Sequence, residues 1–176
     1  MNLKIITAPT IESVSLAEAK LHLRITANTD NVLITSLIKV ARHHCENILH
    51  RALASTTFEL IMDKFPSTQI ELPMPPTELI TSIKYTDYLG IETEWLPTSE
   101  YIFYASEPAI IIPAYGFDFP SFIPYPIGAV KVRFVAGYKT TGNDANLIIP
   151  EEYKQAMLFY KFRIFCCIVI FNEINI

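Results

Sequence analysis

The sequence predicts an α+β fold with a pair of N-terminal helices, a central antiparallel β region and a C-terminal helix. Proline marks this division first, because ten of the twelve prolines lie between Pro66 and Pro126. Proline removes a backbone donor and breaks helix interiors, so the middle of the chain is expected to form strands and ordered turns. The spacing of apolar residues indicates the same division, since apolar residues recur with helical periodicity before this region and alternate within it.

The length of 176 residues is typical of one domain, and we expect a single domain over residues 1–176. Residues 1–54 are predicted to be helical, residues 55–138 antiparallel β structure, and residues 139–176 the last helix and a tail. Hydrophobic residues make up 51% of the sequence and charged residues 18%, which excludes an intrinsically disordered chain. Three cysteines are typical of thiols in a reducing compartment rather than of a disulfide framework.

Charge follows the same division. Residues 55–127 contain two basic and ten acidic side chains, whereas each flank contains six basic and four acidic ones. The net charge of −4 gives no reason to expect a chain that binds nucleic acid or anionic lipid by charge alone.

Both N-terminal helices have clear signals. Ser15 and Glu18 form a capping box, which predicts a first helix up to about Arg24. A second helix is expected from about Asn31 to Arg51, with its apolar residues on one face. The predicted core residues of that helix are Ile34, Leu37, Ile38, Ala41, Cys45, Ile48 and Leu49.

Short strands follow the helices. Apolar residues alternate from Thr57 to Asp63 and again from Val130 to Ala136, each time with one predicted buried face. Gly90 separates two further strands and predicts a hairpin. The remaining predicted strands include residues 70–72, 83–85, 93–96, 101–103 and 109–112.

A last helix is predicted to begin at Pro150, which Glu151 and Glu152 follow. Thirteen of the fifteen residues from 157 to 171 are apolar, but Lys161 and Arg163 leave an uninterrupted run of only eight residues. A membrane-spanning helix needs about 20, so we expect no membrane span. The alternatives are a core helix, a hydrophobic arm that docks in another subunit, and a damaged tail.

His43, Glu46 and His50 form the sharpest candidate for chemistry. Their spacing places two imidazoles and a carboxylate on one helix face, where they could hold zinc. The stronger interpretation is a solvated face, because Lys39 shares it and Glu46 can pair instead with Arg42 or with a charged His50. We therefore expect no metal and no cofactor.

Catalytic motifs are missing from the sequence. Cys45 falls within the apolar stripe and is expected to be a small buried side chain. Glu92 and Glu94 share one side of a strand, where acid and base work is conceivable but the solvated face of an edge strand is the commoner role. The sequence therefore predicts a protein that is not an enzyme, with a small metal-dependent enzyme kept as an alternative.

Residues 116–126 combine four aromatic residues with three prolines. This loop is either pinned over an edge of the core or a preorganised contact surface, because rigid aromatic side chains bind with little loss of entropy. The candidate interface residues are Phe117, Phe119, Phe122 and Tyr125.

Lys131 and Arg133 form a short basic stripe on the strand from Val130 to Ala136. A nucleic-acid-binding module is the second alternative, but one short stripe is more typical of a solvated strand face.

The chain resembles the phage head-tail connector (adaptor) proteins of tailed phages, prophages and gene-transfer agents. No single matching stretch is a mechanistic motif, and the resemblance depends on their order over roughly residues 7–158. The stretches are Pro9, VSLAEAKLHLRI (14–25), LIKVAR (37–42) with Cys45 and Glu46, RAL (51–53), FELIMDKFP (58–66), IELPMPP (70–76), SIKYTD (82–87), IIPAYG (111–116), AVKVRFVAGY (129–138) and IPEEYKQAML (149–158).

This resemblance implies a structural virion protein. Copies would form a homo-oligomeric ring of twelve beneath the portal protein, extend the DNA channel, and offer a surface to a tail-side stopper or head-completion protein. DNA would pass through without specific binding. The protein would be located in the virion, and in the cytoplasm of the host bacterium during assembly.

The chain departs from the family pattern after Leu158. Family members usually continue an amphipathic helix that ends in a polar stretch, and their C-terminal segment commonly docks on the portal. The apolar segment FYKFRIFCCIVIFNEINI (159–176) does not fit that pattern, whereas a frameshift or truncation would produce it. The portal-docking role is therefore an open question for this copy.

Overall fold

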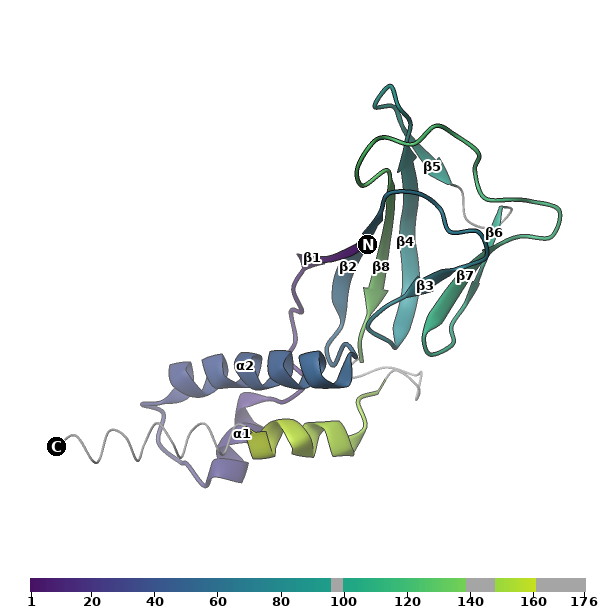
Figure 1. Ribbon diagram of the computed structural model, residues 1–176. Helices are drawn as coiled ribbons and strands as arrows, with labels where there is room; N and C mark the ends of the chain where they lie inside the picture. The colour runs from purple at the N-terminus through teal and green to yellow at the C-terminus, as the bar shows by residue number, and fades with distance from the viewer. Residues whose placement is uncertain (96–99, 139–147, 161–176) are drawn as a thin grey trace. The chain divides into compact units, whose positions relative to one another are not determined.

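The computed structural model describes residues 1–95, 100–138 and 148–160 (Figure 1). The chain divides into two compact units. Unit 1 contains residues 1–10 and 55–137, and unit 2 contains residues 11–54 together with the chain from Tyr138 onward. The α+β class is confirmed, since strands make up unit 1 and helices unit 2.

Unit 1 consists of two antiparallel sheets (Figure 1). The five-stranded sheet has the order β1 (Asn2–Thr7), β2 (Thr56–Met62), β8 (Val130–Ala136), β4 (Thr77–Thr86) and β5 (Glu92–Trp95). The three-stranded sheet has the order β3 (Ile70–Leu72), β7 (Ala109–Pro113) and β6 (Tyr101–Tyr104).

Alternation of side chains gives the larger sheet one buried face. Phe58 of β2 pairs with Phe134 of β8, Leu60 pairs with Val132, and all four side chains are buried. Trp95 at the end of β5 contacts Tyr101 of β6 at a ring-centroid distance of 5.1 Å, which joins the interior of the two sheets. The alternation predicted for β2 and β8 is thus confirmed.

β1 is a strand in the region that was expected to be helical. It pairs with β2, for example Leu3 with Leu60, and forms an edge of the larger sheet. Five of its six residues are exposed, so it lacks the alternating burial pattern by which a strand is recognised in a sequence. Pairing with a distant strand therefore determines this element.

The hairpin predicted at Gly90 is confirmed by the antiparallel pairing of β4 with β5. Gly90 has φ +82°, a left-handed conformation that glycine adopts without steric cost. The Asp87 carboxylate closes the turn by accepting hydrogen bonds from the backbone amides of Leu89 and Ile91, both at 2.9 Å.

Unit 2 begins with helix α1 (Leu16–Leu23), which has the predicted capping box. The Ser15 amide donates to Oε2 of Glu18 at 2.7 Å, and the Glu18 amide donates to Oγ of Ser15 at 3.2 Å. Because two donors of the first turn are satisfied in this way, the start of the helix is well defined. Arg24 ends it in a left-handed conformation.

Helix α2 (Asn31–Leu49) has the predicted core face over most of its length. The prediction was wrong for its last turn, where Ile48 is 63% exposed and Leu49 is 37% exposed. The chain reverses after this turn at His50, which is left-handed, and Leu53 joins the core beside Cys45. The core of unit 2 contains Val14, Ala19, Ile34, Ile38, Cys45, Leu53, Tyr138, Ile149, Met157 and Leu158.

The predicted last helix is present over residues 151–160. Within the described part of the chain, no helix has both the length and the hydrophobicity needed to cross a bilayer. The expectations for the apolar tail fall mostly on residues 161–176, outside the described residues.

Candidate interaction surfaces

The three candidate metal ligands of α2 are not brought together. Glu46 is 5% exposed, whereas His43 and His50 are both exposed. Nη1 of Arg42 donates to Oε2 of Glu46 at 2.7 Å, and the Leu53 amide donates to Oε1 at 2.9 Å. Both carboxylate oxygens therefore have structural partners, and the described residues contain no group of three His, Cys, Asp or Glu that could hold a metal ion.

Arg42 also joins α2 to the segment that precedes α1. Its Nε donates to Oε2 of Glu12 at 2.8 Å, and the side chains of both residues are largely buried. The ion pair between Arg42 and Glu46 was one of the alternatives considered for Glu46, because the two residues are four positions apart on one helix. The sequence contains no signal for the hydrogen bonds to Glu12 and Leu53. This network connects α2 to the segment that precedes α1 and to the segment that follows α2.

Cys45 is buried in the core of unit 2, as predicted. Burial, and to a smaller extent the nearby Glu46 carboxylate, raises the pKa of its thiol. A thiol in this environment remains protonated and is a poor nucleophile.

The aromatic loop has an inner row and an outer row of side chains. Phe119 contacts Phe65 at 5.3 Å and Trp95 at 5.5 Å between ring centroids, and Phe122 contacts Tyr85 at 4.8 Å. Both side chains are half-buried against the interior of unit 1.

Phe117 and Tyr125, the other two candidate interface residues, are 51% and 48% exposed. The loop is thus pinned by its inner side chains and exposes its outer ones, and a contact surface formed by Phe117 and Tyr125 stays a prediction.

The basic stripe of β8 is paired with carboxylates. Nζ of Lys131 lies 3.2 Å from Oε2 of Glu92, and Arg133 lies 2.8 Å from Oε2 of Glu59. Lys84 also pairs with Glu92 at 2.9 Å, and its hydrogen bond is the main cause of the lowered pKa of the Glu92 carboxyl. Each of these cations therefore has an anionic partner on the strand face, and the expectation that the stripe does not bind nucleic acid stays a prediction.

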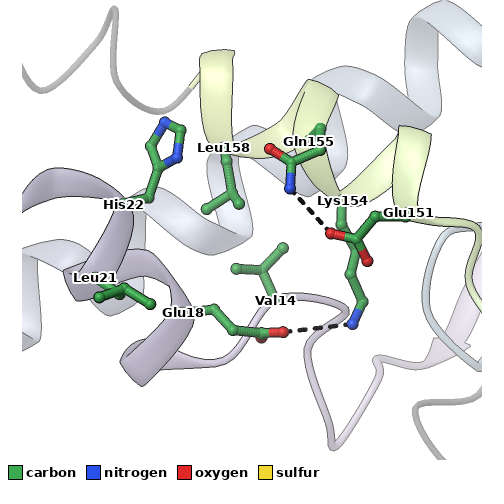
Figure 2. Close-up of a pocket in the computed structure, with 8 residues that line it drawn as sticks. All are labelled: Val14, Glu18, Leu21, His22, Glu151, Lys154, Gln155 and Leu158. Atoms are coloured by element: carbon green, nitrogen blue, oxygen red, sulfur yellow. Dashed lines mark hydrogen bonds and ion pairs between the residues drawn. The ribbon is translucent and has the colours of Figure 1, made fainter.

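A pocket of about 240 Å³ lies within unit 2, between α1 and the helix over residues 151–160 (Figure 2). Val14 and Leu158 form its apolar part, and Nζ of Lys154 closes one side at 3.4 Å from Oε1 of Glu18 (Figure 2). His22 of α1 also meets Phe159 edge-on at 5.9 Å. These contacts seat the last helix against the first.

Comparisons with known proteins identify the family. The model of the phage gp6-like head-tail connector proteins matches residues 13–107, which is more than half of the chain. The chain belongs to this family. Its role is therefore that of a structural head-tail connector protein. This match covers fewer residues than the resemblance seen in the sequence, because the resembling stretches after residue 107 lie outside it.

The fold of this connector is also found in solved structures that cover 94% of the chain. A chain in the neck of an empty gene transfer agent (GTA) particle, computed with C6 symmetry, has a TM-score of 0.76 at 23% identity, over 84% of that chain. A chain in the neck of a native GTA particle, computed with C12 symmetry, has a TM-score of 0.72 at 24% identity, over 83% of its length. A chain in the virion of the native particle has the same score at 23% identity, over 84% of its length.

No curated protein matches the connector by sequence. The family and these structures point to structural proteins rather than to an enzyme. That this chain lacks catalytic activity stays a prediction.

Proposed function

We propose that this connector is one subunit of a closed homo-oligomeric ring in the neck of a virion. The ring lies beneath the portal protein, extends the DNA channel and presents a surface to a tail-side stopper or head-completion protein. The observation that carries the proposal is the family match together with a shared fold over 94% of the chain with GTA neck proteins. A ring of twelve copies is compatible with both the C6 and the C12 symmetry of those particles.

The exposed apolar side chains of both units support an obligate assembly. A stable monomer rarely exposes a large contiguous patch of apolar side chains, because such side chains favour association when they are covered together. In this chain such residues occur on α2, for example Val32 at 84%, and in unit 1, for example Ile127 at 81%. Subunit contacts would cover them.

We further propose that DNA passes the ring without specific binding. Unit 1 is acidic in balance, and Lys84, Lys131 and Arg133 are each paired with a carboxylate. Cations that are neutralised within the protein release few counterions from DNA, so they add little affinity.

The ring is tested with the purified full-length chain by mass photometry and negative-stain microscopy, alone and with a purified portal protein. We expect closed rings of twelve, formed by the chain alone or on the portal. A chain that stays monomeric and does not bind the portal protein would contradict the proposal. Mass spectrometry of purified particles tests whether the protein is present in the virion. Filter retention at low salt tests DNA binding, and we expect none.

A further inference from the structure

The end of the β4–β5 hairpin and the aromatic loop form a short two-stranded ladder in unit 1. The Tyr88 amide donates to the carbonyl oxygen of Ile123 at 2.9 Å, and the Tyr125 amide donates to that of Thr86 at 3.1 Å. Asp87 and Pro124 form an antiparallel bridge between them. Residues opposite each other in an antiparallel pair point to the same side, so Tyr88, Ile123 and Tyr125 share one face.

That shared face is directed away from the interior. Tyr85, three residues before Tyr88, packs on Phe122 inside unit 1, so the alternation along both strands turns the opposite set outward. The outward set and its neighbours form what we call the apolar tip. It consists of Tyr88 (58% exposed), Leu89 (65%), Ile91 (57%), Ile123 (68%), Tyr125 (48%) and Ile127 (81%).

The apolar tip is larger and more rigid than a solvated loop needs. Six large side chains at these exposures present on the order of 800 Å², which is the share that one partner contributes to a standard interface. Backbone hydrogen bonds, the Asp87 turn and the prolines of the loop fix the tip, so that little entropy is lost when it is covered. Close to the tip in the sequence, Lys84 is paired with Glu92, while Glu94 and Asp118 are two further exposed carboxylates, so these surroundings are acidic in balance.

Helix α2 offers the complementary chemistry. Its outer face exposes Val32 (84%), Leu33 (37%) and Val40 (51%) beside Lys39 and His43. The one carboxylate of the helix, Glu46, is buried in its ion pair with Arg42 and is absent from this face. The outer face of α2 is therefore apolar, and its charged residue is Lys39.

We propose that the apolar tip of one copy docks on the outer face of α2 of the neighbouring copy. The inference rests on the proposed ring, because a closed ring with more than two members requires two different surfaces that fit each other. The apolar tip and the outer face of α2 are different surfaces, and both are apolar. Carboxylates outnumber cations near the tip in the sequence, whereas the charged residue on the α2 face is Lys39. Each copy would use its tip toward one neighbour and its α2 toward the other.

The first test compares ring formation by wild type with that of a triple variant, Tyr88→Ser, Ile123→Ser and Tyr125→Ser. We expect the midpoint concentration of assembly, measured by mass photometry, to rise at least tenfold. Tyr115→Ser is the matched control, because Tyr115 is 102% exposed but lies outside the tip, and it is expected to assemble like wild type. Emission of Trp95, which is buried in the inner aromatic cluster, reports whether unit 1 remains folded.

A second variant tests the other surface without touching unit 1. The double variant Val32→Ser, Val40→Ser is expected to weaken assembly by a similar factor, since both side chains project from the helix into water. Unchanged assembly by both variants would overturn the inference, even if binding of the portal or of a tail-side protein is lost.

A cross-link identifies the docked element. Tyr125→benzoylphenylalanine is irradiated in rings made from equal amounts of ¹⁴N and ¹⁵N chains. We expect isotope-mixed cross-links to peptides from residues 31–49. Cross-links only within one chain, or only to unit 1 of a neighbour, would overturn the inference. A wild-type chain that forms no ring refutes the proposed function, whereas rings that survive both variants refute only this docking.

Discussion

In unit 2 the carboxylate of Glu46 lies between Arg42 and the amide of Leu53, and the residue is only 5% exposed. In unit 1 the carboxylate of Glu92 lies between Lys84 and Lys131 on an exposed sheet surface. The charged pairs have similar distances, from 2.7 to 3.2 Å. Burial separates them, because water screens the exposed cluster while a buried charge that loses its partner remains uncompensated.

The comparison extends to the two units as a whole. Unit 2 is held by a polar network and a helix cap in addition to its core, whereas the interior of unit 1 is aromatic and aliphatic, with its charges outside. We therefore expect ionisable residues to determine the stability of unit 2 and apolar residues that of unit 1.

Glu46→Ala has the largest expected effect. Loss of this carboxylate leaves the buried Arg42 guanidinium with one partner fewer and the Leu53 amide without its acceptor, which costs about 3 kcal/mol of unfolding free energy. Urea denaturation followed by circular dichroism measures it. Glu46→Gln keeps an acceptor for Leu53 and should lose less, so equal losses for both variants would contradict this role of the carboxylate.

Phe122→Ala tests the interior of unit 1. The ring contacts Tyr85 and Phe65 but is only half-buried, so we expect a loss of about 2 kcal/mol, below the range for a fully buried phenylalanine. Trp95, the single tryptophan, reports the unfolding by its emission. Phe117→Ala is the matched control from the same loop and should change stability by less than about 0.5 kcal/mol.

Ser15→Ala removes the cap of α1 and is expected to cost about 1 kcal/mol. The cap also predicts a pH dependence, because the hydrogen bond from the Ser15 amide holds the pKa of the Glu18 carboxyl below its ordinary value of 4.5. A lowered folded-state pKa contributes stability above pH 4.5 that is lost as the pH falls through the folded-state value. Thermal melts between pH 7 and pH 3 should show this loss in wild type and less of it in Glu18→Gln.

Glu92→Gln has the smallest expected effect. The two lysine pairs are exposed, so stability should fall by less than about 1 kcal/mol, and the difference from wild type should shrink in 0.5 M salt. Chemical denaturation at low and high salt measures both quantities. A loss as large as that of Glu46→Ala would show that burial does not separate the two clusters.

Much of the fold could be predicted from local signals. The capping box at Ser15 and Glu18 marks α1, and alternation marks β2 and β8, because these signals reflect hydrogen bonds and side-chain directions within a few residues. β1 could not be predicted, since its exposed side chains show no pattern and its paired residues on β2 lie fifty or more residues away.

The candidate sites were predicted only in part. Helical spacing placed His43, Glu46 and His50 on one face, but the fold buries Glu46 with Arg42 and Leu53 and leaves both imidazoles exposed. Helical periodicity contains no information about the segment that follows the helix, and that segment supplies the Leu53 amide.

The sequence by itself determined an α+β chain with an acidic, proline-rich β region between helical flanks, and an aromatic loop at residues 116–126. Only the tertiary structure decided that Phe119 and Phe122 turn inward while Ile123 and Tyr125 turn outward. For residues 122–125 the physical reason is that alternation assigns side chains to two faces but does not say which face is inside. Pairing of the loop with Thr86 and Tyr88, distant in the sequence, makes that choice.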